Sequence, residues 1–346
     1  MASRRHVEDE FAVSEVLGVV MLLAMVITMM GGVFMTLAPY ISDFQDNSSW
    51  AHANGIAERL DGRMEIVGGA SEGTGIKTTI PSATSTISPL TNLEVWTVEA
   101  DLTATERIEV EYLNETQFSI FAYNETAANI TIWTPTGSYE TNFTPSNEPI
   151  LVEHNLSLHS LFIVTVRDAD GNNLHRSAKI SLSGLRIVTN MQNGEHEIAL
   201  INDARYDLFP SEPWTIVEKP ELDVDELIDG TMRASLKLRD VRINGPTPNG
   251  RNTEMEFVSL GPIELFSGDA WHFRYTYYSN LGYTITPQMH EGWLTDYTLN
   301  RASNTLDLHR GISPWLRASG YDGFTIDGGT SMIDLEIDLH RIEVSG

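Results

Sequence analysis

One uninterrupted apolar segment near the start of the chain limits what this sequence can fold into. It runs from Val16 to Ala38, is 23 residues long and contains no ionised side chain. At about 1.5 Å per residue, a helix of this length spans roughly 34 Å, enough to cross the ~30 Å hydrocarbon core of a bilayer. The segment is longer than the core of a secretory signal, and Ala38-Pro39-Tyr40 is a poor cleavage site. We therefore expect a retained helix with the lipid bilayer as partner.

The flanking charges predict the orientation of this helix. Arg4 and Arg5 precede it, and no Lys or Arg follows until Arg59. Basic residues stay on the cytoplasmic side of a membrane, whereas acidic residues count for little. The prediction is a single-pass protein of the cell membrane, with its N-terminus inside and its C-terminal domain outside, at the cell surface.

The residues at the start of the helix resemble a known family. Ala12-Val13-Ser14-Glu15-Val16-Leu17-Gly18-Val19-Val20 resembles the N-terminus of archaeal type IV pilins and the related archaellin-like proteins, over about residues 8–40. In that family a prepilin peptidase cuts before the apolar helix. The resemblance implies a leader, residues 1–12, cut after Ala12 to leave Val13 first, and helices that bundle with other copies into a filament. This chain has Phe11 where the family usually has a charged residue.

Four residues would matter for the assembly of such helices. Glu15 has two interpretations: it pairs with the freed amine of a neighbouring subunit, or it is a solvated carboxylate that favours the helix dipole. Gly18, Gly31 and Gly32 let other helices approach closely. A plain membrane anchor would use the same glycines, so both a bundle and an anchor stay open.

The charge of the chain excludes one class of partner. It has 48 acidic against 22 basic residues, a formal net charge of −26, and no Cys. Nucleic-acid phosphates need a basic surface, so we expect no nucleic acid as partner. An acidic surface of this kind stays soluble in high salt and indicates a salt-adapted protein. Without Cys, the outer domain depends on packing alone.

Asparagine placement supports an outside location. Six of the nine Asn in residues 1–157 lie in Asn-x-Ser/Thr, whereas none of the eleven in residues 158–346 does. The six candidate N-glycosylation sites are Asn47, Asn114, Asn124, Asn129, Asn142 and Asn155. Chance matches in a Thr-rich β segment are the alternative.

The rest of the chain predicts a mainly β protein with a β-sandwich-type outer domain. The transmembrane or filament-core helix over 13–38 is expected to continue as a helical extension over 39–66, ended by Gly68-Gly69. The Ser, Thr and Gly of 67–91 indicate a linker. Residues 92–346 form the β domain, with a subdivision near the prolines of 210–220 as one alternative and a single domain as the other.

Alternating apolar and polar residues mark the strands of this domain. Such alternation occurs around residues 108–112, 130–132, 271–277 and 333–339, and predicts strands with one face in the core and one in water. After His340 the alternation slips by one residue, which predicts a bulge or bend. Asp-Gly pairs at 170, 322 and 327 predict turns.

Residue patterns for chemistry are nearly absent. His196-Glu197 lacks the second His of a zinc helix, and Asp168-Ala169-Asp170-Gly171-Asn172 suits a hairpin turn better than a Ca²⁺ loop. We expect no catalytic residue, no cofactor and no metal. The predicted function is a type IV pilin-like, structural or adhesive surface subunit. Two alternatives stay open: a membrane-anchored envelope protein that does not polymerise, and an anchored extracellular carbohydrate-binding or hydrolase module using two acids about 5–10 Å apart.

Overall fold

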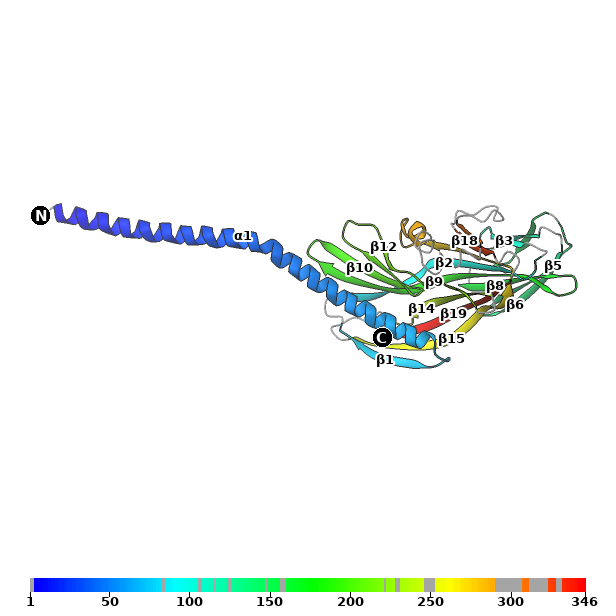
Figure 1. The fold of residues 1–346 in the computed structure, drawn as a ribbon. Coiled ribbons are helices and arrows are strands. Elements are labelled where there is room, and N and C mark those ends of the chain that lie inside the picture. The colour runs from blue at the N-terminus through cyan, green and yellow to red at the C-terminus, as the bar shows by residue number, and fades with distance from the viewer. Residues whose placement is uncertain are drawn as a thin grey trace.

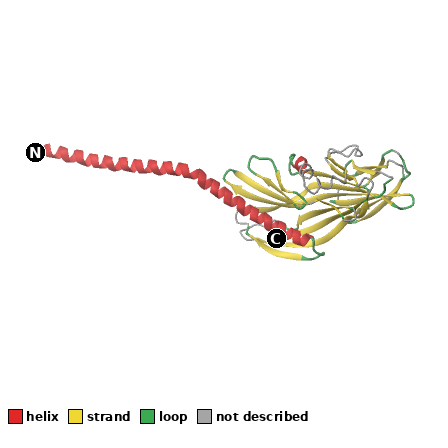
Figure 2. Ribbon diagram, viewed as in Figure 1, coloured by secondary structure: helices red, strands yellow, loops and turns green. Residues whose placement is uncertain are grey.

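The chain forms one long N-terminal helix that projects from a domain of strands (Figures 1 and 2). The computed structural model describes residues 3–81, 85–104, 108–114, 116–122, 126–146, 148–155, 160–220, 222–227, 231–245, 253–289, 307–310, 323–327 and 332–346. The helix, α1, spans Ser3–Gly68 and has Pro39 inside it. It bends about half-way along (Figure 1). We attribute the bend to Pro39, because proline lacks the N–H that an unbroken helix needs. The expected helical extension, with its end at Gly68, is confirmed.

The strands form three sheets. The five-stranded sheet has the order β1 (Gly75–Ile80), β15 (Thr253–Ala270), β19 (Ile333–Ser345), β14 (Met232–Ile243) and β13 (Leu222–Glu226). The eleven-stranded sheet has β12 (Thr215–Glu218), β11 (Ala204–Leu208), β10 (Gly194–Ile201), β9 (Asn173–Met191), β2 (Ser85–Asp101), β16 (His272–Ser279), β18 (Gly323–Asp327) and β17 (Asp307–Arg310). Its side branch is β8 (Leu161–Asp168), β5 (Ala127–Thr134) and β6 (Gly137–Asn142), and the third sheet is β3 (Ile108–Tyr112), β4 (Gln117–Ala122) and β7 (Ile150–Glu153).

The first core lies between the two large sheets. Trp96, Ile180 and Tyr275 enter it from the eleven-stranded sheet, and Leu236 and Leu335 enter it from the five-stranded sheet. None of these five side chains is more than 1% exposed. Two sheets packed face to face around such a layer are a β-sandwich, so the predicted fold class is confirmed.

A second core joins the end of α1 to the sandwich. Ile56, Leu60 and Met64 of α1 pack there with Leu185 of β9 and Phe257 of β15, one strand from each large sheet. Helix residues four apart lie on the same face, so one face of this half of the helix is domain core. The helix and the β domain are therefore a single packed unit from about residue 53 onward.

A third core lies under the three-stranded sheet. Ile108 of β3, Phe118 of β4 and Val152 of β7 pack there against Ile130 of β5 and Val164 of β8. Figure 1 shows β3 and β5 at the end of the domain that is remote from α1. The third core therefore stabilises the distal tip.

The slip of alternation in β19 has a different cause from the predicted bulge. Ile337 and Leu339 face the first core, whereas Ile342 and Val344 face the second. Successive strand residues point to opposite faces, so odd and even positions of a regular strand meet these two cores in turn. The ladder between β14 and β19 continues without a shift, whereas the ladder between β15 and β19 shifts between Ser259 and Pro262, opposite Ile342 and His340. An irregularity is therefore present at the predicted point, but its extra residue lies on β15 and not on β19.

The predicted linker is also wrong, and strand pairing decides between the two alternatives for the β domain. The linker over 67–91 contains β1 and the start of β2, and Ile80 and Ile87 are buried in the second core. The β-branched residues Ile76, Thr78 and Thr79 favour a strand, and pairing with β15 outweighs the Gly and Pro content. The chain does not divide near 210–220, because β2 pairs with β16 and β1 pairs with β15 across that point.

Candidate functional site

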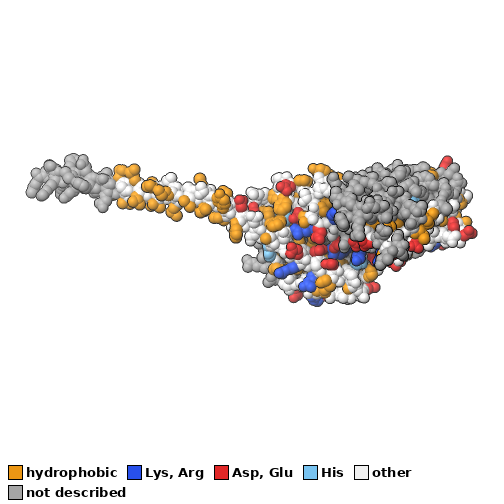
Figure 3. All heavy atoms as spheres, in the orientation of Figure 1, with side chains coloured by type: hydrophobic (Ala, Val, Ile, Leu, Met, Phe, Trp, Pro, Cys, Tyr) orange, Lys and Arg blue, Asp and Glu red, His pale blue; other side chains and the backbone are white. Residues whose placement is uncertain are grey.

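The first half of α1 lies outside the domain. All the large apolar side chains described from Val16 to Phe44 are exposed, from 43% at Val26 to 80% at Met35. A Cβ added at any of the glycines 18, 31 and 32 would meet nothing within 4 Å. Figure 3 shows apolar side chains along this stretch. Within the described residues, this helix is long and apolar enough to cross a membrane.

The residues predicted for processing lie upstream of this stretch. Ala12, Val13 and Glu15 belong to the continuous backbone of α1. Cleavage after Ala12 stays a prediction, and both interpretations of Glu15 stay open.

Polar contacts fix the second half of α1 to the domain. The Arg239 guanidinium donates to Asp61 of α1 at 2.6 Å and to Asp203 at 2.5 Å. Arg205 donates to the side-chain oxygen of Asn54, also on α1. The Arg239 side chain is 7% exposed, whereas those of Asp61 and Asp203 are 36% and 43% exposed, so these half-buried ion pairs help to hold the helix in one position on the sheet.

The candidate glycosylation sites do not share one environment. Four of them are exposed: Asn47 on α1, Asn114 after β3, Asn142 at the end of β6 and Asn155 after β7. Asn129 is only 8% exposed, and its side-chain nitrogen donates to Glu140 and to Asn142, at 2.7 Å each. A glycan would be attached through that nitrogen, and the burial of Asn129 leaves no room for one, so we expect no glycan at Asn129. Asn124 lies outside the described residues.

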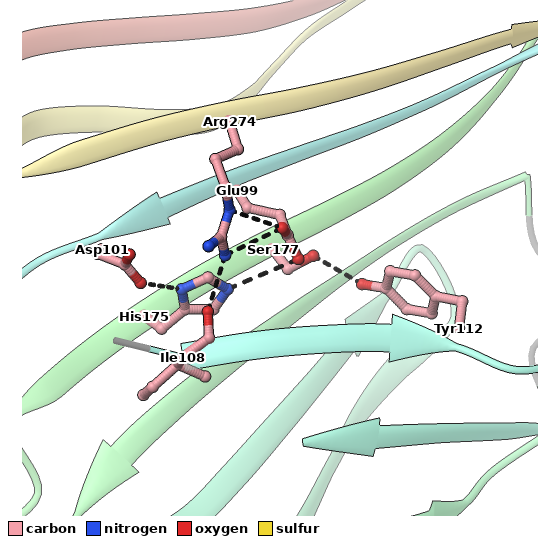
Figure 4. Close-up of polar contacts among 7 residues, drawn as sticks. All are labelled: Glu99, Asp101, Ile108, Tyr112, His175, Ser177 and Arg274. Atoms are coloured by element: carbon pink, nitrogen blue, oxygen red, sulfur yellow. Dashed lines mark hydrogen bonds and ion pairs between the residues drawn. The ribbon is translucent and has the colours of Figure 1, made fainter. Parts of the chain in front are cut away.

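A cluster of buried charges lies between β2, β9, β16 and β3 (Figure 4). In the strand ladders Arg274 faces Glu99, and Asp101 faces His175. The Arg274 guanidinium donates to Glu99 Oε2 at 3.1 Å and to the Ile108 carbonyl oxygen at 2.7 Å. His175 Nδ1 lies 2.7 Å from Asp101 Oδ1, and its Nε2 lies 3.9 Å from Glu99 Oε1. We name these four charged residues, Glu99, Asp101, His175 and Arg274, the charge cluster.

The charges of this cluster support one another. Burial alone would raise the pKa of the Asp101 carboxyl, but Arg274 and then His175 hold that pKa below its ordinary value. The carboxylate is then ionised and can only accept, so His175 Nδ1 is the donor. Burial would lower the pKa of Arg274, but the carboxylates of Glu99, Asp101 and Glu109 raise it. All four cluster side chains are at most 3% exposed.

The geometry of the charge cluster suits holding β3 in place. Arg274 reaches the backbone of β3, and Tyr112 at the end of β3 shares a 2.8 Å hydrogen bond with Ser177 of β9. Ser177 has this partner and is fully buried, so it does not face an external substrate. The described cluster therefore supports a structural role for these polar residues.

A second buried polar group lies in the first core. Trp96 Nε1 donates to Glu94 Oε2 at 3.1 Å, and the Tyr206 and Tyr277 hydroxyls both donate to Oε1. Complete burial raises the pKa of the Glu94 carboxyl to about 7, while these hydrogen bonds oppose the rise. Glu94 therefore changes its charge near neutral pH.

The sequence motifs for metals have structural explanations here. Asp168 closes the turn between β8 and β9, accepting from the backbone nitrogens of Asp170 and Asn172 at 2.9 and 2.8 Å. His196 lies on β10, buried, with Nε2 3.6 Å from Asp207. Among the described residues, no group of three or more His, Asp or Glu could hold a metal ion.

A polar pocket of about 510 Å³ lies beside the β8–β9 turn. Its acidic lining residues are Glu140 and Asp168. Glu140 accepts a hydrogen bond from Asn129, and both carboxylate oxygens of Asp168 accept hydrogen bonds from residues of the turn. The pocket therefore does not favour the two-carboxylate hydrolase.

The alternation over 271–277 predicts that His272 and Arg274 face water, so it does not reveal the charge cluster. Both are buried, at 8% and 3% exposure, and so is Glu109 of β3, at 3%. A signal in the sequence is that ionisable residues occupy alternate positions in two of these strands, Glu99 and Asp101 in one and His272 and Arg274 in the other.

The comparisons with known proteins found no match. No protein-family model matches the chain, and no curated protein matches its sequence.

Proposed function

We propose that this chain is a type IV pilin-like, cell-surface subunit with a structural or adhesive role. The first half of α1 inserts in the membrane, or bundles with other copies in a filament, and the β domain stands outside. The observation that carries the proposal is the division of α1 into an exposed apolar half and a half packed in the domain.

The energetics of the exposed half support this proposal. Burying one large apolar side chain is worth about 1.5–3 kcal/mol. For the run of exposed side chains from Val16 to Phe44, this amounts to tens of kcal/mol. Typical domains have only about 5–15 kcal/mol of stability. Exposing this half to water would therefore cost more free energy than a typical domain gains by folding. Lipid, or a bundle of like helices, would remove that cost.

The resemblance around Ala12 and Val13 adds processing by a prepilin peptidase and an archaeal-type assembly. From the acidic composition we further infer a salt-adapted surface. From the exposed sequons we infer that the β domain is glycosylated, which agrees with the outside orientation inferred from Arg4 and Arg5.

The position of the mature N-terminus tests the pilin proposal. We expect N-terminal sequencing of the protein purified from native membranes to begin at Val13, because the peptidase removes the leader before assembly. The matched control is Ala12→Leu, which replaces the small residue before the cut and is expected to leave the leader attached. A native start at Met1 or Ala2 would favour the unpolymerised anchor instead.

Glycopeptide mass spectrometry tests the outside location. We expect glycan mass at the exposed sites Asn47, Asn114, Asn142 and Asn155, and none at Asn129. Asn129 is the internal control, because it has the same sequon but a buried, bonded nitrogen. A glycan on Asn129, or bare asparagines at all four exposed sites, is the result that contradicts this prediction.

A further inference from the structure

A pocket of about 530 Å³ lies where α1 leaves the domain. Phe44, Asp46 and Ser49 line it from the helix, and Asn190 and Gln192 line it from the β9–β10 hairpin. Figure 1 shows β10 at the end of the domain nearest to the exposed half of α1.

The hairpin is fixed at one level of the helix. The Gln192 backbone nitrogen donates to Asp46 Oδ1 at 2.8 Å, and its side-chain nitrogen donates to Gln45 Oε1 at 3.2 Å. Both bonds bring the tip of the hairpin to one turn of α1. The height of the hairpin above a membrane is therefore set by the depth of the helix.

That level lies just above the membrane surface when the apolar segment spans the bilayer. Asp46 lies eight residues beyond Ala38, which is about 12 Å of helix. Each headgroup layer is roughly 5–8 Å thick. Tyr40 and Phe44, 70% and 74% exposed, lie in between, where aromatic rings favour the interface. Asp46 therefore lies roughly 4–7 Å outside the headgroup layer, and Phe44 lies about 3 Å nearer to it, so the pocket opens just above the headgroups.

The chemistry of the pocket selects among headgroups. No Lys or Arg occurs from residue 6 to residue 58, and the pocket lining has none. Its polar groups are amides, hydroxyls and the Asp46 carboxylate. Such groups bind hydroxyls, whereas a lipid phosphate would need a cation.

We propose that the β9–β10 hairpin, residues 190–194, rests on the outer headgroup layer and that the pocket binds hydroxyl-bearing headgroups. The proposal rests on the insertion of α1 proposed above. Together with the helix, this second contact fixes the orientation of the β domain on the membrane. A helix alone would leave the domain free to rotate and tilt.

Spin labels provide the test, because the chain has no native Cys. The full chain is placed, one copy per disc, in lipid nanodiscs that contain a nickel-chelating lipid. Asn193→Cys puts a label in the exposed hairpin turn, and Asp170→Cys puts the matched control in the exposed β8–β9 turn. Those turns lie at opposite ends of β9, which at about 3.3 Å per residue are roughly 60 Å apart. We expect nickel to relax the label at 193 several-fold more than the label at 170.

Two further readouts separate the possible failures. A label at Met30→Cys reports insertion, since a label inside lipid meets oxygen rather than water-soluble reagents. Equal relaxation at 193 and 170 with Met30 inserted overturns the hairpin contact alone, whereas a water-exposed Met30 label overturns both proposals.

Discs of a digalactosyl lipid are expected to immobilise the 193 label more than discs of phosphatidylcholine do. Equal mobility in both lipids would overturn the binding of hydroxyls.

Discussion

Replacing Arg274 by Met is expected to remove about 3–5 kcal/mol from the free energy of unfolding. Arg274 is 3% exposed and donates to Glu99 and to the Ile108 carbonyl. Met fills a similar volume but has no charge, so Glu99 and Asp101 would remain buried with less compensation. The carbonyl of Ile108 would lose its donor as well, which loosens β3. Urea unfolding of the full chain in detergent, followed by tryptophan fluorescence, measures the loss.

The matched control is Arg233→Met. Arg233 also lies on a strand and donates to Glu336 at 2.7 Å, but its side chain is 49% exposed. Exposed ion pairs contribute about 0–1 kcal/mol, because water solvates both partners. Equal losses in the two variants would mean that the charge cluster does not depend on its arginine.

The strands themselves could be predicted from local alternation. Phe273, Tyr275 and Tyr277 alternate with polar residues, and β16 occupies that segment. The same holds for Ile333 to Leu339 and β19. These predictions succeed because side-chain direction in a strand depends on the neighbouring residues alone.

The layers that cover each strand could not be predicted in the same way. The polar face of β16 is buried because β3, more than 160 residues earlier in the chain, lies over it. In β9 the even position Ile180 faces the first core, and the odd position Ile187 faces the second. Which face meets water is thus decided by elements distant in sequence, and α1 is one of them.

The exposed half of α1 could be predicted more readily than the β domain. The apolar segment from Val16 to Ala38 is a property of consecutive residues, and α1 contains it whole and exposed. The contact of the hairpin at Gln192 with α1 could not be anticipated, since its partner Asp46 lies 146 residues away. Only the fold shows which strands lie beside the exposed half of α1.

Glu94 is expected to make the protein less stable as the pH rises through neutrality. Its pKa is about 7 in the folded protein, against an ordinary value of 4.5. Between these values the folded protein binds more protons than the unfolded chain, so the free energy of unfolding falls as pH increases. The stability linked to this group is fully present below 4.5 and is lost by about pH 7. The shift corresponds to about 3 kcal/mol.

Glu94→Gln isolates this effect, because Gln has nearly the same shape as the protonated acid and does not ionise. Unfolding free energies of the wild type and the variant are compared from about pH 4.5 to about pH 8. We expect the wild type to lose about 3 kcal/mol relative to the variant over this range. Glu195→Gln is the control, since Glu195 lies exposed on β10 and its curve should follow the wild type. Parallel curves for the wild type and Glu94→Gln would show that Glu94 stays ionised inside the core, with Tyr206, Tyr277 and Trp96 donating enough to hold its charge there.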